Sequence, residues 1–489
     1  MAPNSLASVL MSIPATAFQR PLTGRHTATV PVQAQAEPKP DRLMRAVALV
    51  LFTYVWRLQD AFPILGKLQL PALAVFAALI YFRQTKQPAR RVRLIKSPTT
   101  KLVIALMVIM TIGVPFSLWP SHSGTFVFKG MLPNALFLLL VATSVRTIRD
   151  VEWYALVNLY GALVYTTVIS LFFHVGYDGR LGGLIFYDSN DFALVMVCTI
   201  PFAIYFLGKG HRGSHRIAAL VTMGMILTAM VKSGSRGGFI GLVAVMLYVL
   251  LRYRAIPSRV RLAVTVAGLL LFFGFASDTY WTQMGTILHP ESDYNYSDNV
   301  GRVEVWKRGL GYMIHNPIVG VGVGAYPTAE GQSVLARSLE AQGKGFKWSV
   351  AHNSFLETGA ELGFPGALVF IALLVVTAYG LTRLSPRGKW APWITRREMA
   401  LAQMLIGAIV GFSVAGFFVS AEYFAYLYFI LGLAVGLMKL IRLRAGALPA
   451  NRPQINVRLA SRTPMPPDAD LGWVRSSVES SLRGAAPKR

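Results

Sequence analysis

Apolar runs of membrane-spanning length limit this chain more than any other feature. A helix that crosses the hydrocarbon core of a bilayer needs ~20 mainly apolar residues, and runs of that size recur from residue 43 to residue 441. Hydrophobic residues make up 54% of the chain and charged residues only 14%, against about 25% charged in soluble domains. Lipid offers no hydrogen-bond partners to backbone N–H and C=O groups, so a spanning segment must pair them internally, as a helix does. We therefore predict an all-α polytopic membrane protein.

The runs predict about twelve transmembrane helices. We place them at 43–60, 64–82, 101–119, 124–143, 151–174, 190–208, 215–232, 237–253, 261–277, 363–381, 399–419 and 422–441. The first two are the weakest, because Arg57, Asp60 and Lys67 crowd their shared turn. The regions are then a tail 1–42, helices one to nine in 43–276, a polar loop region 277–361 with short helices, helices ten to twelve in 362–441, and a tail 442–489. The composition of both tails is typical of disordered segments.

The positive charges indicate an orientation. The formal net charge is +26, and the excess Lys and Arg gather in the connections 83–101, 209–216, 252–261 and 382–398. All four fall on one side of a twelve-helix order, so the positive-inside rule predicts two cytoplasmic termini and an extracytoplasmic loop region 277–361. Basic residues spread over short loops suit contact with membrane lipid and argue against nucleic-acid binding.

Cysteine and histidine patterns disfavour a metal site. The single cysteine, Cys198, excludes an internal disulfide and a CxxC site. His289, His315 and His352 share the loop region, but their spacing fits no zinc pattern. We predict no metal and no cofactor.

Local signals in the loop region predict its short elements. Residues 303–314 read as an amphipathic helix that ends at Asn316 and Pro317. Three glycines at 320, 322 and 324 then predict a compact and mobile backbone. A possible capping box formed by Ser354 and Glu357 predicts a helix from 355. His352 is therefore expected just ahead of a helix N-terminus.

Three residues on the outer side are candidates for chemistry. Arg236 follows Ser235 in a glycine-rich hairpin at a helix start, which suits either a snorkelling anchor or an anion site. Arg302 is also at a helix start, where a salt bridge with Asp298 or Glu304 is the alternative. His352 is either a satisfied surface histidine or a proton acceptor, since histidine titrates near neutral pH.

A further candidate group precedes the sixth predicted helix. Arg180 could contact phosphate, and Asp188 and Asp191 could hold an arginine in place or bind sugar. The alternative is a capped helix start through Ser189 or Asn190.

Four stretches together resemble one family. They are His352-Asn353 followed after nine residues by Gly363 and then Gly366, Ser235-Arg236-Gly237-Gly238, Gly301-Arg302 with Trp306, and the stretch His315-Asn316-Pro317 to Gly322. Their order and the position of the loop region are similar to those of the O-antigen ligase and polymerase superfamily. The resemblance covers roughly residues 150–440.

This resemblance implies a function. Members are GT-C-type glycosyltransferases of the bacterial inner membrane, which pass a glycan from undecaprenyl diphosphate to an acceptor hydroxyl at the periplasmic face without a nucleotide sugar or metal. Carried over by motif, His352 is implied to be the general base, with Asn353 beside it. Arg236, next to Ser235, and Arg302 are implied to grip the diphosphate.

Two further readings stay open. The resemblance favours a ligase, which transfers to lipid A–core or a similar saccharide, over a polymerase, which transfers to the next lipid-linked repeat. A twelve-helix transporter is the competing class, but no ionisable residues lie clearly at mid-membrane in paired halves, as transporter sites usually require.

Overall fold

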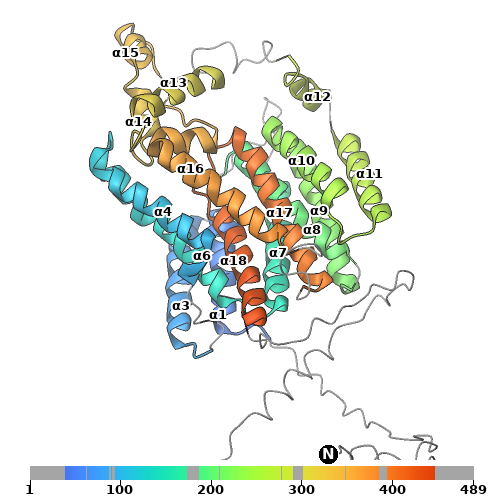
Figure 1. Ribbon diagram of the computed structural model, residues 1–489. Helices are drawn as coiled ribbons and strands as arrows, with labels where there is room; N and C mark the ends of the chain where they lie inside the picture. Colours follow the sequence, from blue (N-terminus) through green and yellow to red (C-terminus); the bar gives the residue numbers. More distant parts are fainter. Residues whose placement is uncertain are drawn as a thin grey trace, which may run out of the picture. The chain divides into compact units, whose positions relative to one another are not determined.

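The described part of the chain is helical. The computed structural model describes residues 39–61, 63–87, 90, 94–172, 187–208, 210–276, 278–289, 301–346, 348–384 and 394–446, and within these ranges it contains helices and no strand. Figure 1 shows the helices α1 to α18. The tails beyond 39 and 446 and the candidate Arg180 lie outside the described residues.

The apolar runs form the helices that the sequence predicts. The first half comprises α1 Arg42–Val50 continued by a π-helical turn Leu51–Val55, α2 Pro63–Gly66, α3 Leu70–Gln84, α4 Pro98–Gly113, α5 Pro120–Phe126 running through Val127–Met131 into α6 Leu132–Ser144, and α7 Ile148–Phe172. The second half comprises α8 Ser189–Leu207, α9 Gly213–Ser233, α10 Arg236–Arg252, α11 Ser258–Phe275, α16 Ser354–Thr382, α17 Arg396–Ala415 with the 3-10 turn η9 Gly416–Phe418, and α18 Ala425–Gly446.

The prediction of an all-α polytopic membrane protein is confirmed. In the described ranges, nine helices are long and apolar enough to cross a membrane. The three other predicted spans are helical but short: α1, α3 and α10. The first of them ends early because the backbone of Arg57 turns into the left-handed region, with φ 45°. The last starts at Arg236 and ends at Arg252, so an arginine limits it at each end.

The core of the helical unit lies around α8 and α18. The spanning window of α8 is 89% buried and that of α18 is 83% buried, whereas that of α11 is 12% buried. A helix that is apolar on every side belongs inside a bundle, and α8 packs against α7, α9, α10 and α17. It therefore forms the centre, while α11 lies at the edge.

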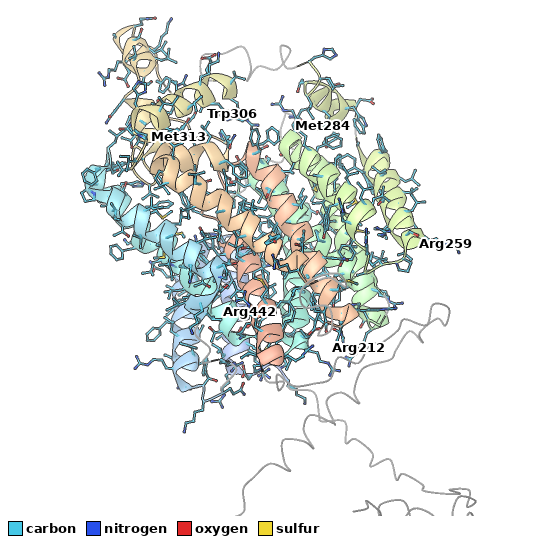
Figure 2. The ribbon with its side chains drawn as sticks, viewed as in Figure 1. Arg212, Arg259, Met284, Trp306, Met313 and Arg442 are labelled. Atoms are coloured by element: carbon cyan, nitrogen blue, oxygen red, sulfur yellow. The ribbon has the colours of Figure 1, made fainter. Side chains whose placement is uncertain are left out.

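The loop region adds helices at one end of the bundle. They are α12 Asp278–Gly285, α13 Arg302–His315, α14 Tyr326–Gly331 and α15 Val334–Ala341, and α13 and α14 pack on α16. Trp306 and Met313 of α13 lie at this end in Figure 2, and Arg212 and Arg442 lie near the opposite end. Inside the loop, the buried Glu330 carboxylate accepts hydrogen bonds from Arg308, the shortest at 2.6 Å, and from Tyr312 at 2.9 Å. Hydrogen bonds to this buried carboxylate thus hold α13 and α14 together within the loop region.

A break in α16 is closed by the glycine-containing loop. Gly363 has φ 68° and ψ −172°, which interrupts the helix. The carbonyl oxygens freed there accept the N–H groups of Val321 and Gly322 at 2.9 and 3.0 Å, and the N–H of Phe364 donates to Pro317 at 2.9 Å. Irregular backbone at the membrane is tolerated only where such partners exist. The loop is therefore buried at residues 320–323 and hydrogen-bonded to α16, so its backbone is compact, as predicted.

Substituting Gly320 is expected to open this junction. Its φ is +67°, and a Cβ there would lie 2.2 Å from the carbonyl carbon of Glu361. Left-handed strain and overpacking together predict that Gly320→Ala lowers the free energy of unfolding by roughly 2–5 kcal/mol, seen as a lower Tm in detergent. Gly311→Ala is the control, because it is helical on α13 with nothing within 4 Å of the added Cβ. Equal Tm values for the two variants would contradict a stabilising role for the close contact between the glycine-containing loop and the break in α16.

Candidate functional site

The hairpin between α9 and α10 presents Arg236 at a helix N-terminus. Gly234 takes a left-handed conformation with φ 61°, and Ser235 caps α10 by accepting the N–H of Gly238 at 3.1 Å. The Ser235 hydroxyl also donates to the Asn190 side chain at 2.9 Å. The half-buried Arg236 is thus the first helical residue, as predicted, and its Nη1 donates to Thr286 Oγ1 at 2.7 Å.

The glycines after Arg236 let three helical elements approach closely. A Cβ on Gly237 would lie 2.6 Å from Cβ of Phe418 in η9, and a Cβ on Gly238 would lie 2.5 Å from Cβ of Ala193 in α8. Side chains larger than hydrogen would push α10 away from both neighbours. The Gly-Gly pair therefore fixes where Arg236 is held.

The helix that begins at Arg302 reaches the chain just before His352. Arg302 is the first residue of α13, after Gly301 as N-cap, and is half-buried. One turn further along, the indole Nε1 of Trp306 donates to the carbonyl oxygen of Ala351 at 2.8 Å. The start of α13 is thereby tied to the peptide that precedes the candidate base.

His352 occupies a constrained position ahead of α16. Its φ is +49°, a left-handed conformation that non-glycine residues seldom adopt, and its side chain is half-buried. The preceding residue is held from two sides, because Glu357 Oε2 accepts the N–H of Ala351 at 2.9 Å while Trp306 binds its carbonyl oxygen. Strain at a residue that its neighbours over-determine is a feature of functional sites.

The capping of α16 differs from the prediction. Asn353, not Ser354, is the N-cap, and its side-chain oxygen accepts the N–H groups of Phe355 and Leu356 at 3.1 Å each. Glu357 makes no capping box, because its carboxylate accepts hydrogen bonds from Ala351 and from the Ser420 hydroxyl. The expectation that His352 precedes a helix N-terminus is nevertheless confirmed.

One short segment, 416–421, contacts all three parts of the candidate site. The Ser354 hydroxyl donates to the Val419 carbonyl oxygen at 2.7 Å and accepts the N–H of Ala421 at 2.9 Å. The ring of Phe417 stacks edge-on to Trp306 with centroids 5.5 Å apart. Phe418 lies under Gly237, as described above. Segment 416–421 therefore joins the starts of α10, α13 and α16, which carry Arg236, Arg302 and His352.

Asp188 and Asp191 have a structural role in the fold. Asp188 is the N-cap of α8 and accepts the N–H groups of Asn190 and Asp191 at 2.7 Å. Asp191 completes the capping box by accepting the N–H of Asp188 at 3.2 Å. The capped helix start is thus present, formed by the two aspartates rather than by Ser189 or Asn190.

A group of buried glutamates beside the site was not predicted. Glu357, Glu361 and Glu422 are at most 6% exposed, and the first two are one helical turn apart on α16. The Tyr423 hydroxyl donates to Glu361 at 3.0 Å, while Oε2 of Glu422 has no hydrogen-bond partner among the described residues. Burial, with the nearby Glu357 and Glu361 carboxylates, raises the pKa of Glu422 well above its usual range. The sequence signal that could have indicated this group is the i, i+4 spacing of Glu357 and Glu361 just before an apolar run.

Glu422 is expected to make stability depend on pH. Its pKa is raised on folding, so the folded state binds the proton more tightly, and stability falls as pH rises above the ordinary value near 4.5. Glu422→Gln should therefore stabilise the protein increasingly with pH, by up to about 1.4 kcal/mol per pH unit for one proton. Tm measured from pH 5 to 8 tests this. The exposed Glu340 provides the control Glu340→Gln, and a pH-independent difference between wild type and Glu422→Gln would refute the expectation.

No metal centre is visible in the part of the chain that the structure describes. Groups of three or more His, Cys, Asp or Glu side chains able to hold an ion do not occur there.

A comparison with protein families identifies the region that contains the site. Residues 193–371 match the sequence model of the family described as O-Antigen ligase. None of the curated proteins compared with the chain matches it. The family match begins in α8, ends in α16 and includes Arg236, Arg302 and His352. Residues 193–371 are thus similar to the O-antigen ligase family, in agreement with the motifs that suggested this family.

Proposed function

We propose that this protein is an O-antigen ligase-type glycosyltransferase. It moves a glycan from undecaprenyl diphosphate to a hydroxyl of lipid A–core or a similar saccharide acceptor. The observation that carries the proposal is the junction at segment 416–421, to which the elements bearing Arg236, Arg302 and His352 are all joined. Arg212 and Arg442, which lie near the end of the bundle opposite α13 in Figure 2, support an orientation in which the site faces the periplasm from the inner membrane, with both termini cytoplasmic.

The proposed reaction divides its work between a base and two cations. His352 accepts the proton of the acceptor hydroxyl as that oxygen attacks the anomeric carbon of the donor sugar. The bond from this carbon to the diphosphate oxygen breaks, and the diphosphate leaves with the electron pair. Arg236 and Arg302 hold the diphosphate, whose charge grows in the transition state, so their effect is largest there. Arg180 remains a proposed third contact.

The proposed supporting residues act through backbone geometry. Asn353 and Ser235 fix the starts of the helices that carry His352 and Arg236. Asp188 and Asp191 fix the start of α8, where Asn190 receives the Ser235 hydrogen bond. These residues position the reacting groups and need not touch either substrate.

Reconstitution with two acceptors tests the proposal. Purified protein in liposomes receives a lipid-diphosphate-linked glycan together with either lipid A–core or a second lipid-linked repeat. A glycan joined to lipid A–core supports a ligase, and an elongated lipid-linked chain supports the polymerase of the same superfamily. If a donor known to be active gave neither product, glycosyl transfer would be overturned as the function.

A further inference from the structure

Two spanning helices carry rows of exposed apolar side chains that end near the loop region. The helices are α4 and α16, which pack against each other (Figure 1). A spanning helix exposes such side chains to lipid, so both rows are lipid-facing. The rows are Ile104, Val108, Ile112 and Phe116 on the span that starts with α4, and Phe364, Leu368, Ile371 and Val375 on α16.

The glycine-containing loop after α13 connects the ends of both rows. The N–H of Phe364 donates to the carbonyl oxygen of Pro317 at 2.9 Å, so Ile318 lies beside the start of the α16 row. The N–H of Leu118, two residues past the α4 row, donates to the carbonyl oxygen of Val321 at 2.9 Å. Ile318 is 72% exposed and Leu118 is 44% exposed. The lipid-facing surface therefore continues from the bundle onto the loop region.

Helix α13 extends this surface further. Leu310 and Ile314 are exposed, and Ile318 follows them at the same four-residue spacing. The opposite side of the helix is packed, because Gly309 is buried against the side chain of Tyr326 in α14. A helix with one packed side and one exposed apolar side is typical of helices that lie in a membrane interface. The exposed apolar row on α13 thus needs a partner outside the described residues.

We propose that the second half of α13 and Ile318 are immersed in the membrane leaflet on the loop-region side, in contact with phospholipid acyl chains. Continuity selects lipid over a protein partner, since a protein that covered Ile318 would also displace lipid from Phe364. The exposed His315 and Asn316 keep the immersion shallow, at the ~5–10 Å of interfacial helices. The exposed Lys307, one turn before the apolar row, stays in water.

This contact goes beyond the proposed reaction and bears on its site. Trp306 lies one turn before Leu310 and donates to the carbonyl oxygen of Ala351. Lipid that fixes α13 therefore also helps to fix the peptide that precedes His352. The loop region is then anchored to the membrane through its own helix as well as through the spanning helices.

Depth-dependent quenching of a fluorophore tests the immersion. The native Cys198 is buried, so a maleimide dye added in detergent should label the introduced thiol of Ile318→Cys. In nanodiscs, where both membrane faces are accessible, this dye should be quenched by spin-labelled acyl chains and protected from iodide. Val334→Cys is the matched control, because Val334 is also apolar, is 85% exposed and lies on α15, which packs on α14. Its dye should show the opposite pattern. Equal iodide quenching of the two dyes would overturn the proposal.

A second measurement uses the wild-type protein, in case Ile318→Cys does not fold. Phospholipid with a photoreactive group on its acyl chain should label residues 310–318 together with α4 and α16, and should leave residues 334–341 unlabelled. Labelling of α4 and α16 without residues 310–318, or equal labelling of 310–318 and 334–341, would overturn the immersion of α13. Both readouts are independent of glycan transfer, so failure of the proposed function would be seen separately.

Discussion

Glycan transfer should fall by about 10²–10⁴-fold in His352→Ala, the range that a general base contributes. The loss should appear in kcat, because the side chain acts on the acceptor proton rather than on donor binding. Transfer of a radiolabelled glycan in liposomes measures it. The folded amount should stay at the wild-type level, since the peptide before His352 is held by Trp306 and Glu357 rather than by the imidazole.

A second histidine supplies the control for this result. His289 is exposed in the turn that follows α12. His289→Ala should retain wild-type transfer. If His352→Ala also retained it, or if both variants lost it equally, the role of His352 as base would be wrong.

Arg236→Ala should reduce transfer about 10²–10³-fold, the cost of losing one preorganised donor to a developing charge. Arg236→Lys should recover part of the rate, because lysine keeps the charge but loses the planar pair of donors. The comparison is made by kcat/KM for the lipid-linked donor. A rate for Arg236→Lys equal to that of the wild-type protein would argue against bidentate binding of the diphosphate.

An arginine of the loop region, away from Arg236, separates the effect of a local contact from the effect of net charge. Arg337 is exposed on α15, and Arg337→Ala changes the formal charge by the same amount as Arg236→Ala. It should leave kcat/KM unchanged. A comparable loss in Arg337→Ala would mean that the overall positive charge, rather than a contact at Arg236, attracts the donor.

The helices could be predicted from sequence because their signals are local. Apolar length identified the nine helices of membrane-spanning length in the described ranges, and the charged turn at Arg57 marked the span that ends early. The break in α16 also has a local signal, because Gly363, Pro365 and Gly366 stand close together there. Orders of motifs along the chain were enough to suggest the family.

The contacts that assemble the site could not be read in the same way. The hydrogen bond from Trp306 to Ala351 spans 45 residues, and the one from Ser354 to Val419 spans 65. Glu357 was assigned to a local capping box because no sequence signal revealed Ser420 as its partner. The backbone hydrogen-bond acceptors of Val321 and Gly322 likewise belong to a distant helix.

The seal between α16 and the glycine loop determines where this protein can be cut and recombined. A boundary between residues 361 and 362, which hydropathy suggests, would pass through the hydrogen bonds that satisfy the broken helix. A chimera that exchanges the loop region between relatives must therefore carry the chain at least as far as Phe364, so that the loop and the broken part of α16 come from one parent. The loop and the first part of α16 should therefore be exchanged together.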